Sequence, residues 1–399
     1  MGYWVALHPT TQQPIPPTTT SILRDLVAFP ILGGEPNGAI IDYIEGYLAS
    51  LGVTSTRVPS PDEPQDKAGL HARIGPAVDG GVILSGHTDV VPVEGQDWTS
   101  DPFALTERDG RLYGRGACDM KGFLACVLAA VPTLLAAELS RPVYLCFSYD
   151  EEIGCVSGRL MADAIREHYA ERPAACIVGE PSMLQPVVGH KGIAVYKVIV
   201  RGSAGHSSRI RTEVSAVHEA ARLVGWCEDY MEGLIARGAL DERFDPPHTS
   251  VHVGQLHGGT AHNIVADEAW FTVDIRNIPA DAQGDVVDDL RAAAKTQEAA
   301  MRERFANASI EVAPYHPAVP PLDTPADSPA IDLAARLSGR RDTTAVSYAA
   351  EAGQFANAGF ATVICGPGDI AQAHRADEFI SVEQLRLGLE MIERLASVG

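Results

Sequence analysis

The spacing of hydrophobic residues changes along the chain and predicts alternating helices and strands. From Ser21 to Leu51 apolar residues recur every three or four positions, which predicts a helical stretch. Helical patterns such as Lys121–Leu139 then separate short apolar runs that show no alternation, which is typical of strands covered on both faces. These runs are Val82–Ser85, Val143–Ser148, Ala175–Val178 and Ala361–Cys365. We therefore expect an α/β fold with a mostly parallel sheet, whose sites lie beyond the carboxyl ends of the strands.

The pattern changes between about residues 190 and 314, where strands and helices follow the order βαββαβ. The predicted elements are strand Ile193–Arg201, helix Thr212–Ala236, strands Ser250–Leu256 and Glu268–Arg276, helix Asp281–Phe305 and strand Ser309–Ala313. This order is the split βαβ arrangement of a ferredoxin-like domain. We expect residues 1–189 and 315–399 to form the main domain and residues 190–314 to be inserted in it.

Composition and charge narrow the class of protein. The chain has 399 residues, enough for two or three domains, with ordinary hydrophobic (46%) and charged (21%) fractions. Its net charge of −21 repels nucleic acid and anionic membranes. No apolar stretch approaches the roughly 18 residues of a membrane span, and the first residues lack a basic or apolar leader, so we expect a cytoplasmic protein. The seven cysteines have no C-x₂-C spacing and are interpreted as reduced thiols.

Candidate chemistry begins where the first predicted strand of the sheet ends. His87 stands at that end, and Asp89 follows two positions later, on the same side of an extended chain. A carboxylate so placed can hold the imidazole N–H, which fixes the tautomer of a metal-binding histidine. Asp119 precedes the helical run from Lys121. The alternatives are a strand-end histidine followed by an aspartate in a turn, and an aspartate that caps a helix.

Three consecutive acids, Asp150, Glu151 and Glu152, end another buried strand. Like charges oppose one another's ionisation, so a metal cation would stabilise this cluster; the alternative is a solvated acidic turn. Glu180 and His374 each follow a further predicted strand, although singly they could be a loop carboxylate and a structural histidine. Together the candidates bring imidazole and carboxylate ligands to one edge of the sheet, which suits Zn²⁺, and a shared carboxylate suits two such ions.

Eight segments, in order along the chain, resemble the co-catalytic di-zinc amidohydrolases, which include acetylornithine deacetylase, succinyl-diaminopimelate desuccinylase, aminoacylase and related carboxypeptidases. The segments are SGHTDVVP, GRGACDMKG, DEEIG, GEPS, GSAGHSSR, AHNIVAD, AAEAGQF and CGPGDIAQAHRADEF. The resemblance implies metal-dependent amide hydrolysis with two Zn²⁺ per subunit, replaceable by Co²⁺ or Mn²⁺, and no redox or nucleotide cofactor. It also implies that the main domain is catalytic and that the inserted domain mediates a homodimer.

The resemblance assigns roles residue by residue. The ligands implied for one zinc are His87, Asp119 and Glu180, and those for the other are Asp119, Glu152 and His374. Glu151 would be the general base. Neighbours on an extended chain point opposite ways, which agrees with separate duties for Glu151 and Glu152. Asp89 is a further catalytic candidate, because its carboxylate could hold the imidazole of His87.

Four further residues are candidates for contact with the substrate. His206 matches a histidine that reaches the active site of the other subunit. Arg276 and Asn263 match residues that hold the substrate's carboxylate, and a guanidinium fork suits that group, although an exposed strand arginine is the alternative. Glu351 is a candidate to face the substrate; its alternative is a solvated carboxylate at a helix end.

The segments AAEAGQF and CGPGDIAQAHRADEF resemble the acetylornithine deacetylase branch most. This resemblance implies hydrolysis of N-acetyl-L-ornithine to acetate and L-ornithine, a step of arginine biosynthesis. A desuccinylase, a general deacylase of N-acyl amino acids and a dipeptidase are alternatives with the same chemistry. A non-catalytic ligand-binding paralogue is the alternative from another class, but it would be expected to lose the base or a ligand, and all of them are present.

Overall fold

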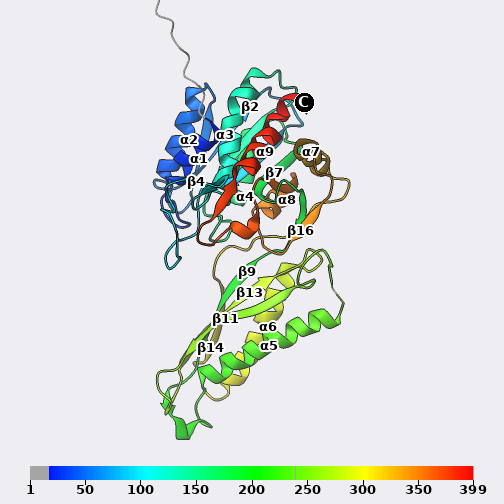
Figure 1. Ribbon diagram of the computed structural model, residues 1–399. Helices are drawn as coiled ribbons and strands as arrows, with labels where there is room; N and C mark the ends of the chain where they lie inside the picture. The colour runs from blue at the N-terminus through cyan, green and yellow to red at the C-terminus, as the bar shows by residue number, and fades with distance from the viewer. Residues whose placement is uncertain (1–17, 239, 399) are drawn as a thin grey trace, which may run out of the picture.

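The larger domain is built on one mixed sheet, which lies in the upper part of Figure 1. The structure is a computed structural model that describes residues 18–238 and 240–398. The strands in spatial order are β1 (Ser55–Pro59), β2 (Ala68–Ile74), β6 (Val143–Ser148), β3 (Val82–His87), β7 (Ala175–Pro181), β17 (Ala361–Gly366), β8 (Val187–His190) and β15 (Leu322–Asp323), with β16 (Thr344–Val346) beside β8. The predicted buried runs form β6, β3, β7 and β17, which are adjacent and parallel, whereas β1, β2 and β15 are antiparallel. The mostly parallel sheet is confirmed.

Helices cover both faces of this sheet. Consecutive residues of β3 enter different cores: Leu84 packs with α1, α3 and α9, and Ile83 packs with α4 and α8. This explains why the run shows no polar alternation. The helices of the larger domain are α1 (Thr19–Val27), α2 (Gly38–Ser50), α3 (Lys121–Ala136), α4 (Gly158–His168), α7 (Pro329–Ser338), α8 (Ala352–Asn357), α9 (Val382–Glu393) and α10 (Leu395–Val398).

The helical stretch predicted over Ser21–Leu51 is two helices, α1 and α2. Pro30 and Pro36 lie in the segment between them, where proline removes a backbone donor and fixes φ.

A small sheet of β4 (Thr106–Arg108), β5 (Arg111–Tyr113) and β18 (Phe379–Ser381) brings the region around residue 378 beside the loop that follows β5. No described helix is long and apolar enough to cross a membrane. Residues 1–17, part of the basis for the predicted location, lie outside the described residues.

The inserted domain has its own sheet and its own core, in the lower part of Figure 1. Its elements are β9 (Ala194–Arg201), α5 (Ala216–Ala236), β11 (Ser250–Gly258), β13 (Glu268–Arg276), α6 (Gln283–Arg302) and β14 (Ser309–Pro314). The antiparallel strand order β11-β13-β9-β14 is that of a ferredoxin-like fold, so the predicted βαββαβ unit is confirmed. At the outer end of this sheet, β10 (Gly205–His206) pairs with β12 (Ile264–Val265). We propose the predicted boundaries, 1–189, 190–314 and 315–399, as the division into domains.

Candidate active site

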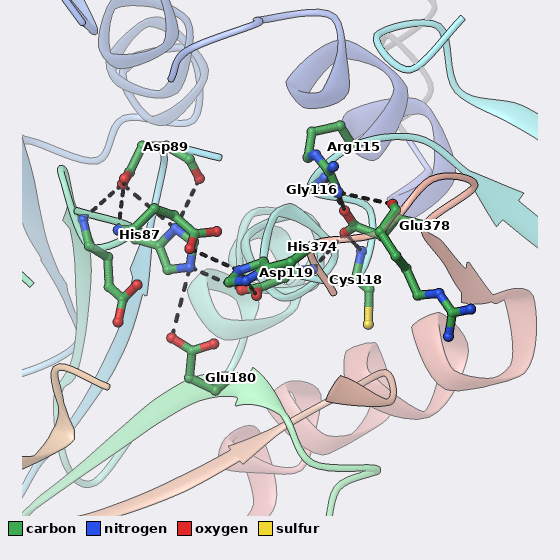
Figure 2. Close-up of polar contacts among 12 residues, drawn as sticks. His87, Asp89, Arg115, Gly116, Cys118, Asp119, Glu180, His374 and Glu378 are labelled. Carbon is green, nitrogen blue, oxygen red and sulfur yellow. Dashed lines mark hydrogen bonds and ion pairs between the residues drawn. The ribbon is translucent and has the colours of Figure 1, made fainter. Parts of the chain in front are cut away.

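The carboxyl ends of the adjacent parallel strands gather the acidic and histidine residues. His87 ends β3, Glu180 lies near the end of β7, and Glu152 follows β6. Asp119 comes from the loop before α3 and His374 from the loop after the short helix η2 (Ile370–Gln372). All five were predicted as metal ligands, and the fold brings them together, as Figure 2 shows for the labelled residues.

Asp119 stands between two histidines. Its Oδ1 lies 3.1 Å from Nε2 of His87 and its Oδ2 lies 3.3 Å from Nε2 of His374. Nε2 of His374 is also 2.9 Å from Oε2 of Glu152, and Nε2 of His87 is 3.8 Å from Oε1 of Glu180. One carboxylate therefore faces two sets of nitrogen and oxygen donors, which is the arrangement expected of a bridging ligand.

The donor set fits divalent cations. Two groups of three offer ligand atoms within 4.8 Å of one another: His87, Asp119 and Glu152, and His87, Glu151 and Glu180. Oε1 of Glu180 is buried and accepts no hydrogen bond from the described residues, so a ligand atom is left facing the cluster. Imidazole nitrogen and carboxylate oxygen suit zinc and its neighbours in the first transition row.

The charges of the cluster also favour the binding of a cation. Burial, with Glu152 nearby, raises the pKa of Glu151 to about 8, and burial with Asp119 nearby raises that of Glu152 to about 7. Hydrogen bonds to Asp119 and Glu152 raise the pKa of His374 to about 10. Without a cation Glu151 and Glu152 therefore tend to hold protons, because burial disfavours their charged forms and neighbouring carboxylates repel them. A divalent cation would relieve the same repulsion.

Asp89 supports the site differently from the prediction. Nδ1 of His87 donates to the main-chain oxygen of Asp89 at 3.0 Å, whereas the nearest carboxylate oxygen of Asp89 is 3.6 Å away. That carboxylate instead accepts the N–H groups of Glu151 (3.2 Å) and Glu152 (3.1 Å). The backbone of Asp89 thus fixes the tautomer that leaves Nε2 free for a metal, and its side chain holds the acidic turn.

Asp150 does not join its two acidic neighbours in the cluster. It takes a left-handed conformation (φ 55°), and its carboxylate pairs at 2.7 Å with the buried ammonium group of Lys67. It also accepts the N–H of Gly34 at 2.9 Å. The turn separates Asp150 from Glu151 and Glu152, which face the ligands. Lys67 carried no signal in the sequence, because nothing local links it to the acidic run.

Glu378 is a second residue that the sequence did not single out. It is buried and receives N–H groups from Gly116 (3.1 Å), Cys118 (2.9 Å) and Asp119 (3.0 Å). Its Oε2 also lies 2.6 Å from the guanidinium of Arg115. Figure 2 shows this clamp beside the ligand cluster. Glu378 therefore holds the backbone of the loop that carries the bridging aspartate.

A cavity of about 400 Å³ opens over the cluster and reaches the inserted domain. The residues that line it include Glu151, Glu180, Cys155 and Tyr348 from the main domain and Arg276 from the end of β13. Arg276 is at present paired with Asp274, at 2.8 and 3.2 Å. The cavity thus joins the acidic cluster to one guanidinium group, as expected for an anionic substrate. Tyr348 was not predicted.

Glu351 does not face this cavity. Its side chain is buried beneath the sheet end, 1% exposed, where it accepts the hydroxyl of Ser85 at 2.6 Å. In this structure Glu351 is therefore placed away from the cavity where the substrate is expected, and it is not a solvated carboxylate. A glutamate at the start of a short helix can point inward or outward, and its partner on β3 lies 266 residues away in the chain.

His206 and Asn263 lie near each other but far from the cavity. Ser207 donates its N–H to the main-chain oxygen of Asn263 at 3.0 Å, and both predicted residues are exposed. This corner lies beyond the Glu268 end of β13, where Glu268 pairs with Arg201, whereas Arg276 ends the same strand at the cavity. Eight strand steps of about 3.4 Å separate the two ends by roughly 27 Å. Within one chain these residues do not reach the acidic cluster.

Comparison with known proteins agrees with this geometry. The family model for Peptidase family M20/M25/M40 matches residues 83–398. Acetylornithine deacetylase of Salmonella arizonae is 32% identical over 385 residues, which cover 95% of this chain and 97% of that protein. The Salmonella agona protein of the same name is 33% identical over the same shares.

Solved structures share the fold over 95% of the chain. An M20 family metallo-carboxypeptidase from Sulfolobus solfataricus has a TM-score of 0.73 and 20% identity, covering 95% of this chain and 98% of its own. A dinuclear metal-binding peptidase of the M20 family from Bacillus subtilis has a TM-score of 0.61 and 18% identity, with 95% and 97% covered. The chain is thus a metal-dependent hydrolase, and it belongs to the peptidase family M20/M25/M40.

Proposed function

We propose that this hydrolase cleaves the amide bond of N-acetyl-L-ornithine to acetate and L-ornithine, a step of arginine biosynthesis in the cytoplasm. The observation that carries the proposal is the identity of 32% to acetylornithine deacetylases along 95% of the chain. The cavity supports it, because the acidic cluster and Arg276 line the same space. A single guanidinium fork suits a substrate with one carboxylate.

We propose two zinc ions in each subunit, with Co²⁺ or Mn²⁺ as possible substitutes. The ligands would be His87, Asp119 and Glu180 for one ion and Asp119, Glu152 and His374 for the other. Zinc bound there would lower the pKa of water toward neutrality and withdraw charge from the acyl oxygen. The carboxylate of Asp119 would serve both ions, which agrees with its two short contacts to histidine nitrogens.

Glu151 is the proposed general base. Its side chain is partly buried at the cavity wall, and the thiol of Cys155 donates to its Oε1 at 3.1 Å. As the oxygen of water bonds to the acyl carbon, Glu151 takes the water proton. When the C–N bond breaks, Glu151 returns that proton to the departing amine nitrogen, leaving acetate and a free amino group. Arg276 would hold the substrate's carboxylate after releasing Asp274.

A homodimer would complete the site. His206 and Asn263 stand at the outer end of the inserted sheet, away from their own cavity. An insertion that presents a corner outward can bring these side chains to a neighbouring chain's cavity if two copies pair about a two-fold axis. We propose that His206 then stabilises the tetrahedral oxyanion and that Asn263 helps hold the substrate's carboxylate.

Substrate choice is tested by kcat/KM measured side by side. The panel is N-acetyl-L-ornithine, other N-acetyl amino acids, N-succinyl-diaminopimelate and a dipeptide, with the metal content of the same sample determined. We expect N-acetyl-L-ornithine or a close N-acetyl amino acid to lead. A tenfold advantage of the succinyl compound or the dipeptide, about 1.4 kcal/mol in transition-state binding, would replace the deacetylase by one of those activities. Bound metal without any turnover would indicate a ligand-binding paralogue.

A further inference from the structure

Tyr348 is a polar residue of the cavity wall to which the proposed mechanism gives no task. It follows β16, and it lines the cavity together with Glu151, Glu180 and Arg276. Its hydroxyl is shielded from solvent and finds no hydrogen-bond partner among the described residues. Buried polar groups are nearly always paired, so an unpaired hydroxyl beside a reaction site indicates a partner that arrives with the substrate.

The charges around Tyr348 make its hydroxyl a donor. Burial, followed by the carboxylates of Glu180, Asp119 and Glu151, raises the pKa of the phenol well above its usual value. The phenol is therefore held in its protonated form, which can donate a hydrogen bond. A protonated phenol near three carboxylates can stabilise a further oxygen that becomes negative, without adding to the net negative charge.

The backbone on both sides of Tyr348 is fixed. The hydroxyl of Ser347 donates to the main-chain oxygen of Asp245 at 2.7 Å and accepts its N–H at 3.1 Å. Ala350 and Glu351 are buried at the start of α8. Tyr348 is thus held between a loop of the inserted domain and the core of the main domain, and a donor held in place before the reaction needs little reorganisation.

We propose that Tyr348 is a further catalytic residue, whose hydroxyl donates a hydrogen bond to the acyl oxygen as the carbonyl carbon becomes tetrahedral. The proposal rests on the proposed amide hydrolysis and applies to whichever N-acyl substrate or peptide is cleaved fastest. Glu151 takes the water proton and Arg276 the substrate's carboxylate, and His206 is proposed to reach the oxyanion from the other subunit. Tyr348 adds a second donor to that oxygen, from the chain that holds the proposed ligands. The proton stays on the phenol throughout, and no bond to Tyr348 forms or breaks.

The test is Tyr348→Phe, which removes only the oxygen. Loss of one oxyanion donor lowers kcat by roughly 10²-fold or more, so we expect that fall with KM within twofold of the parent. Metal content, measured by elemental analysis, should equal that of the parent. Affinity for a phosphonamidate that mimics the tetrahedral state should weaken by a similar factor, whereas affinity for the product amino acid should not change. Tyr315→Phe, at a tyrosine 62% exposed, is the matched control and should alter none of these values.

Two results would overturn the proposal: an unchanged kcat, or a fall in metal content that accounts for the fall in kcat, since Tyr348 would then act through the metal ligands. A 3-fluorotyrosine at position 348 keeps both ring and hydroxyl and should hold kcat within threefold of the parent, even if the phenylalanine variant folds poorly. If the parent prefers a dipeptide over N-acetyl-L-ornithine, the deacetylase assignment fails. Tyr348→Phe is then assayed on the dipeptide. A failure of the deacetylase assignment can thus be told apart from a failure of the proposed role of Tyr348.

Discussion

Replacing Glu378 by glutamine should weaken the metal site while every proposed ligand side chain stays unchanged. Oε1 of Glu378 accepts the N–H groups of Cys118 and Asp119, and Oε2 accepts that of Gly116 and pairs with Arg115. Glutamine has one acceptor oxygen and one NH₂ group. In either orientation of its amide, the NH₂ meets donors that need an acceptor. The substitution therefore keeps the volume and removes half of the clamp.

The expected loss of folding stability in Glu378→Gln follows from the burial of its ion pair. Removing one partner of a buried ion pair costs about 3–5 kcal/mol, because the other charge stays behind. Arg115 keeps the side-chain oxygen of Gln96 at 2.6 Å and the main-chain oxygen of Pro92 at 3.3 Å, so we expect the lower end, about 3 kcal/mol. Groups that orient metal ligands typically contribute 10- to 100-fold to metal affinity, and we expect a loss of roughly that size because Asp119 loses its anchor.

The assay compares urea unfolding and zinc dissociation in the parent and in Glu378→Gln. Asp163→Asn is the matched control, because Asp163 pairs with Arg159 at 2.6 Å on the surface, and it should leave both measurements unchanged. A Glu378→Gln variant that loses less than about 1 kcal/mol and binds zinc within twofold of the parent would refute the clamp. Loss of stability with unchanged zinc affinity would keep the buried ion pair but refute the anchoring of Asp119.

Glu151→Ala should keep the metal content of the parent and lose at least roughly 10²-fold in turnover, as expected for a general base, whereas Glu152→Ala should lose one metal equivalent; elemental analysis beside kcat decides. Mixing inactive His206→Ala chains with inactive Glu151→Ala chains should restore part of the activity, and no recovery after demonstrated subunit exchange would contradict action across the dimer. In the metal-free protein the pKa values of Glu151 and His374 are raised to about 8 and about 10, from 4.5 and 6.5. Above pH 6.5 the folded chain therefore binds more protons than the unfolded chain, and its stability falls as the pH rises. The Tm of chelated protein should therefore fall from pH 6.5 to 9 relative to that of metal-loaded protein, and parallel Tm curves would be the contrary result.

The ligand cluster could be predicted because the sequence pattern shows where the parallel strands end. The buried runs before His87, Glu152 and Glu180 lack alternation, so they predict parallel strands, whose carboxyl ends meet at one edge. The βαββαβ order of the inserted domain was readable for the same reason, since α5 and β13 show clear periods of their own. Local periodicity was sufficient for both features.

The supporting residues could not be predicted, because their partners are distant in the chain. Lys67 and Asp150 are 83 residues apart, and Glu378 lies about 260 residues from the loop that it holds. Glu351 shows the same limit, since nothing in the local sequence indicated the direction of its side chain. Tyr348 belongs to a half-buried segment in which every residue from Thr344 to Ala349 is partly exposed, so no pattern marked it.

Three buried acids that are not proposed ligands hold loops around the site by accepting backbone N–H groups. Asp89 accepts two N–H groups of the acidic turn, Asp150 accepts that of Gly34, and Glu378 accepts three from the loop of Asp119. Two of these acids are neutralised by buried cations, Asp150 by Lys67 and Glu378 by Arg115.

The proposed ligand carboxylates have no such partner. Asp119, Glu152 and Glu180 contact histidine nitrogens, but none of them pairs with a lysine or arginine in the described part of the chain. Burial and mutual repulsion make carboxylates without cations take up protons, as the raised pKa of Glu152 indicates. Lys67 and Arg115 thus neutralise acids that hold the loops, not the proposed ligands. The negative charge of the ligand carboxylates lies at the place where divalent cations are proposed to bind.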